Sequence, residues 1–151
     1  MANTQAMCTS FKAEILSGIH ALGTTVIRAG TGADTIKAAL YLASATVNAS
    51  TTVYSATGEV SGTGYTAGGV TVTNATAPTS TGTTAFWTPS ASFTYTTVTL
   101  TTSFDCVLVY NSTQSNKSIS AHTFGAQTIT AGTFVLSMPT NDSTNALIRI
   151  A

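Results

Sequence analysis

The feature that most constrains the fold is a change in hydrophobic period at residue 24. From there on, apolar and polar residues alternate in short segments, which is typical of strands with one buried face. In the first such segment, residues 36–42, we expect Lys37 and Tyr41 to face away from the core. The apolar residues that share the opposite, core-facing side are Ile36, Ala38, Leu40 and Leu42.

The alternation, or a short β-branched run, returns in seven further segments. These are residues 70–73, 83–87, 93–100, 106–110, 118–124, 133–138 and 146–150. Turn-forming residues gather between them, at 58–69, 76–81, 111–117, 131–132 and 139–145. About eight strands at intervals of roughly 10 to 15 residues predict an all-β fold, an antiparallel β-sandwich of jelly-roll type. Threonine is a common filler because a β-branched hydroxyl side chain suits a pleat with one wet face.

The segment before residue 24 follows a different period. Phe11, Ile15, Ile19 and Leu22 recur every three or four residues, which predicts a short amphipathic helix. Thr9 or Ser10 can cap its start and Gly23 can end it. We therefore expect an N-terminal arm and helix over residues 1–23 and a β-sandwich domain over residues 24–151.

The low charge of the chain argues against a nucleic-acid partner. Charged residues make up 7% of the chain, against about 25% in a typical soluble domain, and five basic residues balance five acidic ones. Nucleic-acid binding needs clustered cations, which are missing here. A protein with so little charge has little to keep it from associating with other surfaces, so the composition favours a role in an assembly.

The sequence contains no recognisable signal for export or for insertion into a membrane. The first ten residues lack a basic stretch followed by an apolar run, so no signal peptide is expected. No stretch approaches the roughly 18 apolar residues of a membrane helix. Cys8 and Cys106 are far apart and lack metal-binding spacing, and we expect two reduced, partly buried thiols rather than a disulfide.

Groups that could perform chemistry are scarce. The two histidines, His20 and His122, belong to no HxH or HExxH pattern, so we expect no metal, no cofactor and no enzymatic activity. A hydrolase would require a triad built around His122 and Asp105, which spacing alone does not indicate.

Aromatic residues supply the candidate contacts. Phe86 and Phe93 are expected in the core, whereas Trp87 and Tyr95 would be good interface anchors if they face outward. Tyr65 lies in the glycine-rich segment 58–69, interpreted as a loop available for contact. The candidate interface residues are Phe11, Ile15, Ile19, Tyr65, Trp87 and Tyr95.

Four blocks of sequence resemble a family of small structural proteins from tailed-phage virions. They are Asp34-Thr35-Ile36-Lys37-Ala38-Ala39-Leu40-Tyr41; Gly58-Glu59-Val60 with Gly64-Tyr65-Thr66-Ala67-Gly68-Gly69; Leu108-Val109-Tyr110-Asn111-Ser112-Thr113; and Phe124-Gly125 through Asn145-Ala146-Leu147-Ile148-Arg149-Ile150.

Within such virions the chain is most similar to a capsid cement or decoration protein, which binds between major capsid subunits and stiffens the shell. The resemblance implies the major capsid protein as partner, self-association as a dimer or trimer, and a place on the capsid exterior after synthesis in the bacterial cytoplasm. It implies no nucleic acid, membrane or small-molecule substrate.

Two alternatives use the same fold. One is a neck, tail or fibre component of the virion. The other is a carbohydrate-binding sandwich in which Trp87, Tyr95 and Tyr65 form a stacking platform.

Overall fold

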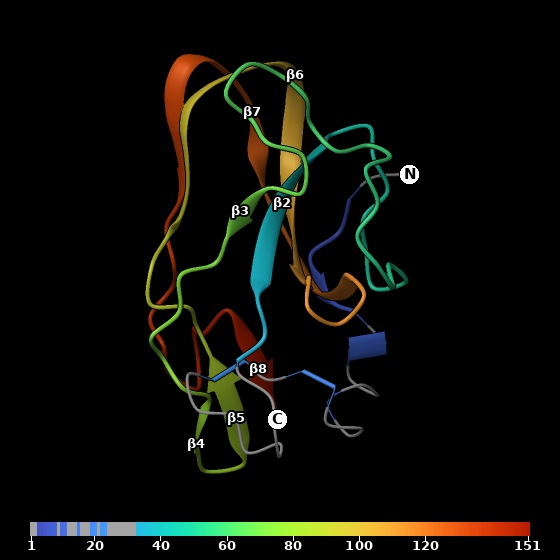
Figure 1. Ribbon diagram of the computed structural model, residues 1–151. Helices are drawn as coiled ribbons and strands as arrows, with labels where there is room; N and C mark the ends of the chain where they lie inside the picture. Colours follow the sequence, from blue (N-terminus) through green and yellow to red (C-terminus); the bar gives the residue numbers. More distant parts are fainter. Residues whose placement is uncertain (1–2, 9, 12–14, 16–18, 21, 24–32) are drawn as a thin grey trace.

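The described residues of the chain form two antiparallel β-sheets (Figure 1). This computed structural model describes residues 3–8, 10–11, 15, 19–20, 22–23 and 33–151. The larger sheet has the strand order β1-β7-β6-β2-β3 and the smaller the order β4-β5-β8. The strands are β1 (Ala6–Met7), β2 (Ile36–Leu42), β3 (Val70–Thr71), β4 (Thr79–Thr81), β5 (Thr84–Trp87), β6 (Phe93–Asn111), β7 (Lys117–Leu136) and β8 (Ile148–Ile150). The alternation along the sequence therefore predicted the fold class correctly.

The two longest strands, β6 and β7, pair with each other as one long hairpin. Its register shifts four times between Tyr95 and Cys106, and Thr97 and Ala131 have φ of 53° and 47°. Bulges of this kind bend and twist a strand. The hairpin accordingly bends over at the top of Figure 1, so the first half of β6 and the last half of β7 descend beside the rest of the sheet.

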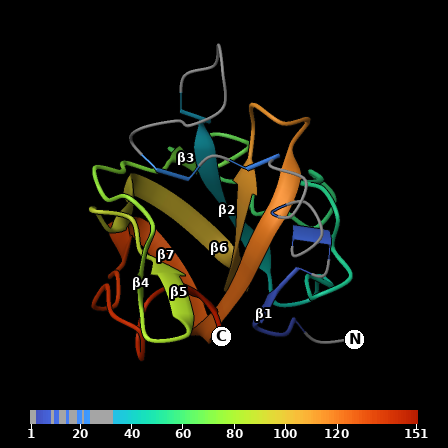
Figure 2. The ribbon, with the colours of Figure 1, turned by 90° about the horizontal axis from the view of Figure 1, so that it is seen from below.

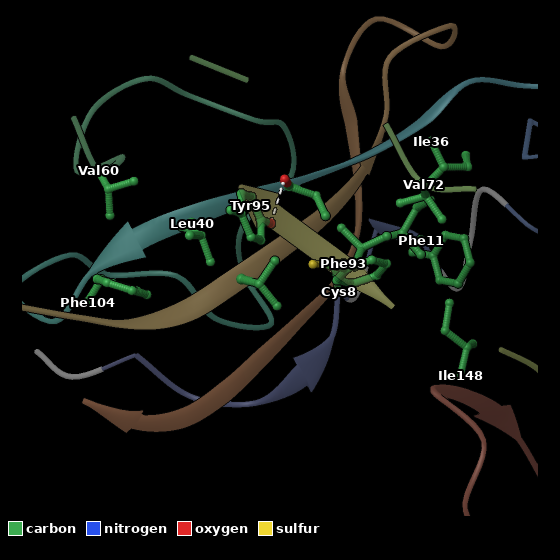
Figure 3. Packing of buried hydrophobic residues seen from close by; sticks show 14 of the residues in the cluster. Cys8, Phe11, Ile36, Leu40, Val60, Val72, Phe93, Tyr95, Phe104 and Ile148 are labelled. Carbon is green, nitrogen blue, oxygen red and sulfur yellow. Dashed lines mark hydrogen bonds between the residues drawn. The ribbon is translucent and has the colours of Figure 1, made fainter. Parts of the chain in front are cut away.

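The main core lies between the two halves of this folded hairpin. Figure 3 shows the side chains of Phe93 and Tyr95, from the first half of β6, packed in one cluster with Leu40 of β2. The Tyr95 hydroxyl also donates a 2.9 Å hydrogen bond to the Ala38 carbonyl. This bond satisfies a phenol that is only 3% exposed, and it ties the first half of β6 directly to β2.

A second, smaller core covers the other face of β2. It contains Ala39 and Tyr41 of β2 together with Leu108 and Tyr110 of β6. Tyr41 points to the face opposite Ile36, Ala38 and Leu40, as predicted, but this face is not exposed, because the Tyr41 side chain is 3% exposed. The long connection between β2 and β3 packs against this face through residues such as Val47 and Tyr54. The alternation in β2 indicated only one buried face. The segment that covers the other face has no regular hydrophobic period, so nothing in the sequence indicated that it packs there.

The N-terminal segment is attached to the larger sheet. β1 lies at the sheet's outer edge beside β7 (Figure 2), with Ala6 opposite Ala121. Phe11 is fully buried in the main core. The sequence predicts an arm over residues 1–23; of the described residues in that range, β1 pairs with the larger sheet and Phe11 packs in the main core. The helix predicted up to Gly23 falls mostly on residues outside the described part of the chain.

Candidate functional site

Glu59 is the centre of a buried, hydrogen-bonded polar cluster. Its carboxylate accepts hydrogen bonds from the hydroxyls of Tyr54 (2.6 Å) and Tyr65 (2.7 Å) and from the backbone N–H of Gly68 (2.7 Å). Glu59 is only 9% exposed. A buried carboxylate is tolerated where donors replace its lost water, and these three donors do so.

Tyrosine hydroxyls extend this cluster into the sheet. The Tyr65 hydroxyl accepts a 3.0 Å bond from the Leu40 N–H, and the Tyr110 hydroxyl donates a 2.8 Å bond to the Gly68 carbonyl. The rings of Tyr54 and Tyr110 stack with centroids 4.7 Å apart. We name Tyr54, Glu59, Tyr65, Gly68 and Tyr110 the Glu59 cluster. It fastens the glycine-rich loop onto β2 and β6.

The phenols of this cluster remain protonated donors over the physiological range. Burial, followed by the hydrogen bond to Glu59, raises the pKa of Tyr54 and of Tyr65 well above the usual value near 10. Burial and the nearby Glu59 charge raise the pKa of Tyr110 to about 12. None of these tyrosines therefore has a pKa suited to proton transfer at neutral pH.

A cavity of about 230 Å³ lies beside the cluster. Tyr65 and Tyr95 line it, with ring centroids 6.0 Å apart and planes 20° from parallel. Its other lining residues are Gly64, Thr66, Gly69, Val70, Thr94, Thr96 and Val98. The lining contains no charged side chain, so the cavity suits an uncharged group.

His122 and Ser120 form a hydroxyl–imidazole pair. Ser120 Oγ and His122 Nε2 are 2.9 Å apart, and both residues line a polar cavity of about 330 Å³ between β1, β7 and residues 144–149. Burial lowers the pKa of His122 to about 4, so the imidazole is neutral at pH 7. The Ser120 residue is only 2% exposed.

The carboxylate required for a triad is held elsewhere. Asp105 accepts a 2.6 Å hydrogen bond from Asn3 Nδ2, and no bond between Asp105 and His122 occurs in the described structure. Among the described residues, the Ser120–His122 pair therefore lacks the Asp105 carboxylate that a triad would use to orient the imidazole. Within the described ranges, no three His, Cys, Asp or Glu side chains lie close enough together to hold a metal ion. Cys8 and Cys106 are both fully buried and are not joined by a disulfide.

The candidate interface residues are divided between the core and the surface. Phe11, Trp87 and Tyr95 are at most 3% exposed, so they pack in the core and do not face outward, as an interface anchor would have to. The Trp87 indole N–H is also satisfied internally, by the Thr76 carbonyl at 3.1 Å. Trp87 lines a separate apolar cavity with Phe11, and it therefore shares no stacking platform with Tyr65 and Tyr95.

The remaining candidates stay partly accessible. Ile15, Ile19 and Tyr65 are half-buried. Phe86 and Phe93 are 7% and 2% exposed, which confirms their prediction as core residues. The larger exposed apolar side chains of the described chain are instead Val53, Val135 and Ile150.

The sequence alone does not reveal the Glu59 cluster. In the sequence Glu59 is one of five isolated acids, and Tyr65 is a contact residue of a flexible loop. The available signal was an acid that lies between Tyr54 and Tyr65 in the sequence and is followed, after Tyr65, by the glycines Gly68 and Gly69. Such a pattern becomes meaningful only when the loop is known to fold back on a sheet.

In the part of the chain that the structure describes, no helix has the length and apolar character needed to cross a membrane. No family model, curated protein or solved structure matches the chain.

Proposed function

We propose that this chain is a non-catalytic structural protein of a tailed-phage virion, a cement protein that binds the major capsid protein on the outside of the shell and stabilises the head. The resemblance of its sequence blocks to small virion proteins supports this role. The role requires a small, stable domain with a large uncharged surface and no active site.

The observation that carries the proposal is that the acidic side chains form hydrogen bonds within the fold. Glu59 is bonded by two tyrosines and a backbone N–H, and Asp105 by Asn3. Asp34 accepts from Asn111 at 2.8 Å, and Asp142 accepts from the backbone of Asn145 at 2.7 Å. All four acidic side chains described by the structure therefore hold loops and turns in place, which supports a protein whose ionisable groups serve its own fold.

The accessible surface fits the same role. Threonines are exposed along the bent part of the long hairpin, and residues 118–136 of β7 include no Asp, Glu, Lys or Arg. Burying such a surface against a partner removes few charges from water, so contacts repeated by symmetry can add up. Self-association as a dimer or trimer on the lattice belongs to this proposal.

The test is the thermal stability of shells. Empty shells assembled from the major capsid protein alone are heated with and without the purified chain, and disassembly is followed by calorimetry. We expect the chain to raise the disassembly temperature in a saturable manner, because a ligand that binds only the assembled state stabilises it. An unrelated uncharged protein of equal size is the control. An unchanged temperature at saturating concentration would contradict the proposal and favour a neck, tail or fibre position.

A further inference from the structure

Strand β6 changes its neighbours along its length. Residues 104–111 lie between β2 and β7, whereas residues 93–98 are paired with β7 alone. Beyond that stretch, an isolated bridge joins Thr99 to Thr63 of the glycine-rich loop. Gly64 of this loop packs on Thr97, where a Cβ added to Gly64 would lie 2.2 Å from the Thr97 carbonyl oxygen. Within the described chain, only the backbone of residues 93–96 therefore has no neighbouring strand or loop on its side away from β7. An unpaired backbone edge of this kind is a template for another strand.

The cavity beside the Glu59 cluster borders this edge. Thr94 and Thr96 are exposed and Tyr95 is buried, so their side chains lie on opposite faces of β6. All three residues nevertheless line the same cavity. Because alternate residues of a strand face opposite ways, a cavity that touches all three must run along the backbone between them.

The opposite wall of the cavity is formed by the glycine-rich loop, which contacts with β2 hold in place. Gly69 of this wall sits so close to β2 that a Cβ built on it would lie 1.8 Å from the Ala38 carbonyl oxygen. The Tyr65 ring is fixed by Glu59 and by the Leu40 N–H. A wall held by these contacts needs little ordering when a ligand arrives, which favours binding.

We propose that the edge of β6 at Thr94–Thr96, with the Tyr65–Tyr95 cavity beside it, receives an extended, uncharged segment of a partner protein as an added strand. Main-chain hydrogen bonds from β6 hold the segment, and its small apolar or hydroxyl side chains enter the cavity. The absence of charge from the lining excludes acidic and basic segments, which would lose their hydration there. This inference rests on the proposed function, in which the partner is the shell protein.

The test compares two double substitutions on one strand. Thr94→Lys with Thr96→Lys places two charges on the proposed edge, where lysines obstruct strand addition. Thr101→Lys with Thr102→Lys adds the same charges at exposed positions of β6 outside the cavity. Circular dichroism and melting of each purified variant check that it is folded. Binding of the wild type and both variants to empty shells is then measured by co-sedimentation.

We expect the Thr94/Thr96 variant to bind at least about tenfold more weakly and the Thr101/Thr102 variant to stay within about twofold of the wild type. Hydrogen exchange at the amides of residues 93–96 should slow on binding of the wild type. Equal binding of all three proteins would overturn the inference and leave the proposed function standing. Failure of the wild type to bind would instead contradict the proposed function.

Two other occupants have distinct signatures. A second copy of this chain would appear as wild-type self-association that the Thr94/Thr96 variant abolishes in analytical ultracentrifugation without shells. A sugar would appear as binding of wild type, lost in the same variant, on a glycan array of neutral oligosaccharides. Either result would overturn the assignment of a partner-protein strand to this edge.

Discussion

The hydroxyl of Tyr65 donates a 2.7 Å hydrogen bond to the carboxylate of Glu59, six residues earlier in the same loop. The same hydroxyl accepts a bond from the Leu40 N–H in β2. A single phenol therefore connects a buried carboxylate to the main sheet. This relationship explains how a glycine-rich segment without regular secondary structure is held firmly against the core.

Removing the carboxylate should destabilise the fold strongly. Glu59→Ala leaves three donors, Tyr54, Tyr65 and Gly68, without their acceptor. Since each unsatisfied buried donor costs about 1–3 kcal/mol, we expect the free energy of unfolding to fall by about 3–5 kcal/mol in urea denaturation. Tyr54→Phe removes one of the three bonds and should cost about 1–2 kcal/mol. Equal, small effects of both substitutions would contradict this account of the cluster.

Two glycines with left-handed backbones should respond very differently to alanine. Gly69 has φ +72°, and a Cβ there would lie 1.8 Å from the Ala38 carbonyl oxygen, so Gly69→Ala must displace the backbone of β2 or the loop. Gly82 has φ +60°, and a Cβ added there would meet nothing within 4 Å, so Gly82→Ala should cost only about 1–2 kcal/mol of backbone strain. We expect Gly69→Ala to be the more destabilising by at least about 2 kcal/mol in the same denaturation assay. Similar losses for both variants would show that the close approach at Gly69 is absent.

Stability should decrease as the solution is acidified below about pH 6.5. Burial lowers the pKa of folded His122 from 6.5 to about 4, so between these values the unfolded chain binds a proton that the folded chain does not. At about 1.4 kcal/mol for each pKa unit, the contribution lost by pH 4 is about 3 kcal/mol. His122→Gln should flatten the pH dependence over this range. An NMR titration in which the His122 imidazole protonates near pH 6.5 would contradict the prediction.

Binding to the shell should resist salt. The surfaces proposed to meet the partner carry few charges, and salt screens only charge–charge contacts. We therefore expect most copies to stay on the shell in about 1 M NaCl, as measured by sedimentation and gel densitometry. Release of most copies at that concentration would indicate an electrostatic interface.

Local signals were sufficient for some elements. The alternation over residues 36–42 predicted β2 with its observed bounds, and the polar residues of segment 111–117 predicted the turn between β6 and β7. In both places side-chain period and turn chemistry agree with the final structure. The second buried face of β2 was missed for a tertiary reason, because Ala45, Val47 and Tyr54 cover that face only after folding.

Bulges misled the strand boundaries. Residues 93–100 and 106–110 were predicted as two strands but form the single strand β6, because the register shifts across residues 101–105 interrupt the alternation without ending the pairing. Ala131-Gly132 was predicted as a turn and lies inside β7. A residue with positive φ and a following glycine suit a bulge as well as a turn.

The short strands and the polar cluster depend on their neighbours. β4 falls within a predicted turn, and its three residues are ordered by pairing with β5. The Glu59 cluster joins two parts of a loop to β2 and β6, so no local pattern defines it. The candidate contact residue Tyr65 lies beside a cavity, whereas Trp87 and Tyr95 lie in the core because burial of their large apolar rings is favourable.

The central claim is that this chain acts through its surface as part of a shell. An image reconstruction of the virion, with the copies of this chain counted and located, tests it most directly. The account predicts hundreds of copies seated on the outside of the capsid lattice, each touching more than one major capsid subunit. A ring of about 5 to 12 copies at the neck or tail, or no copies in the particle, would contradict it.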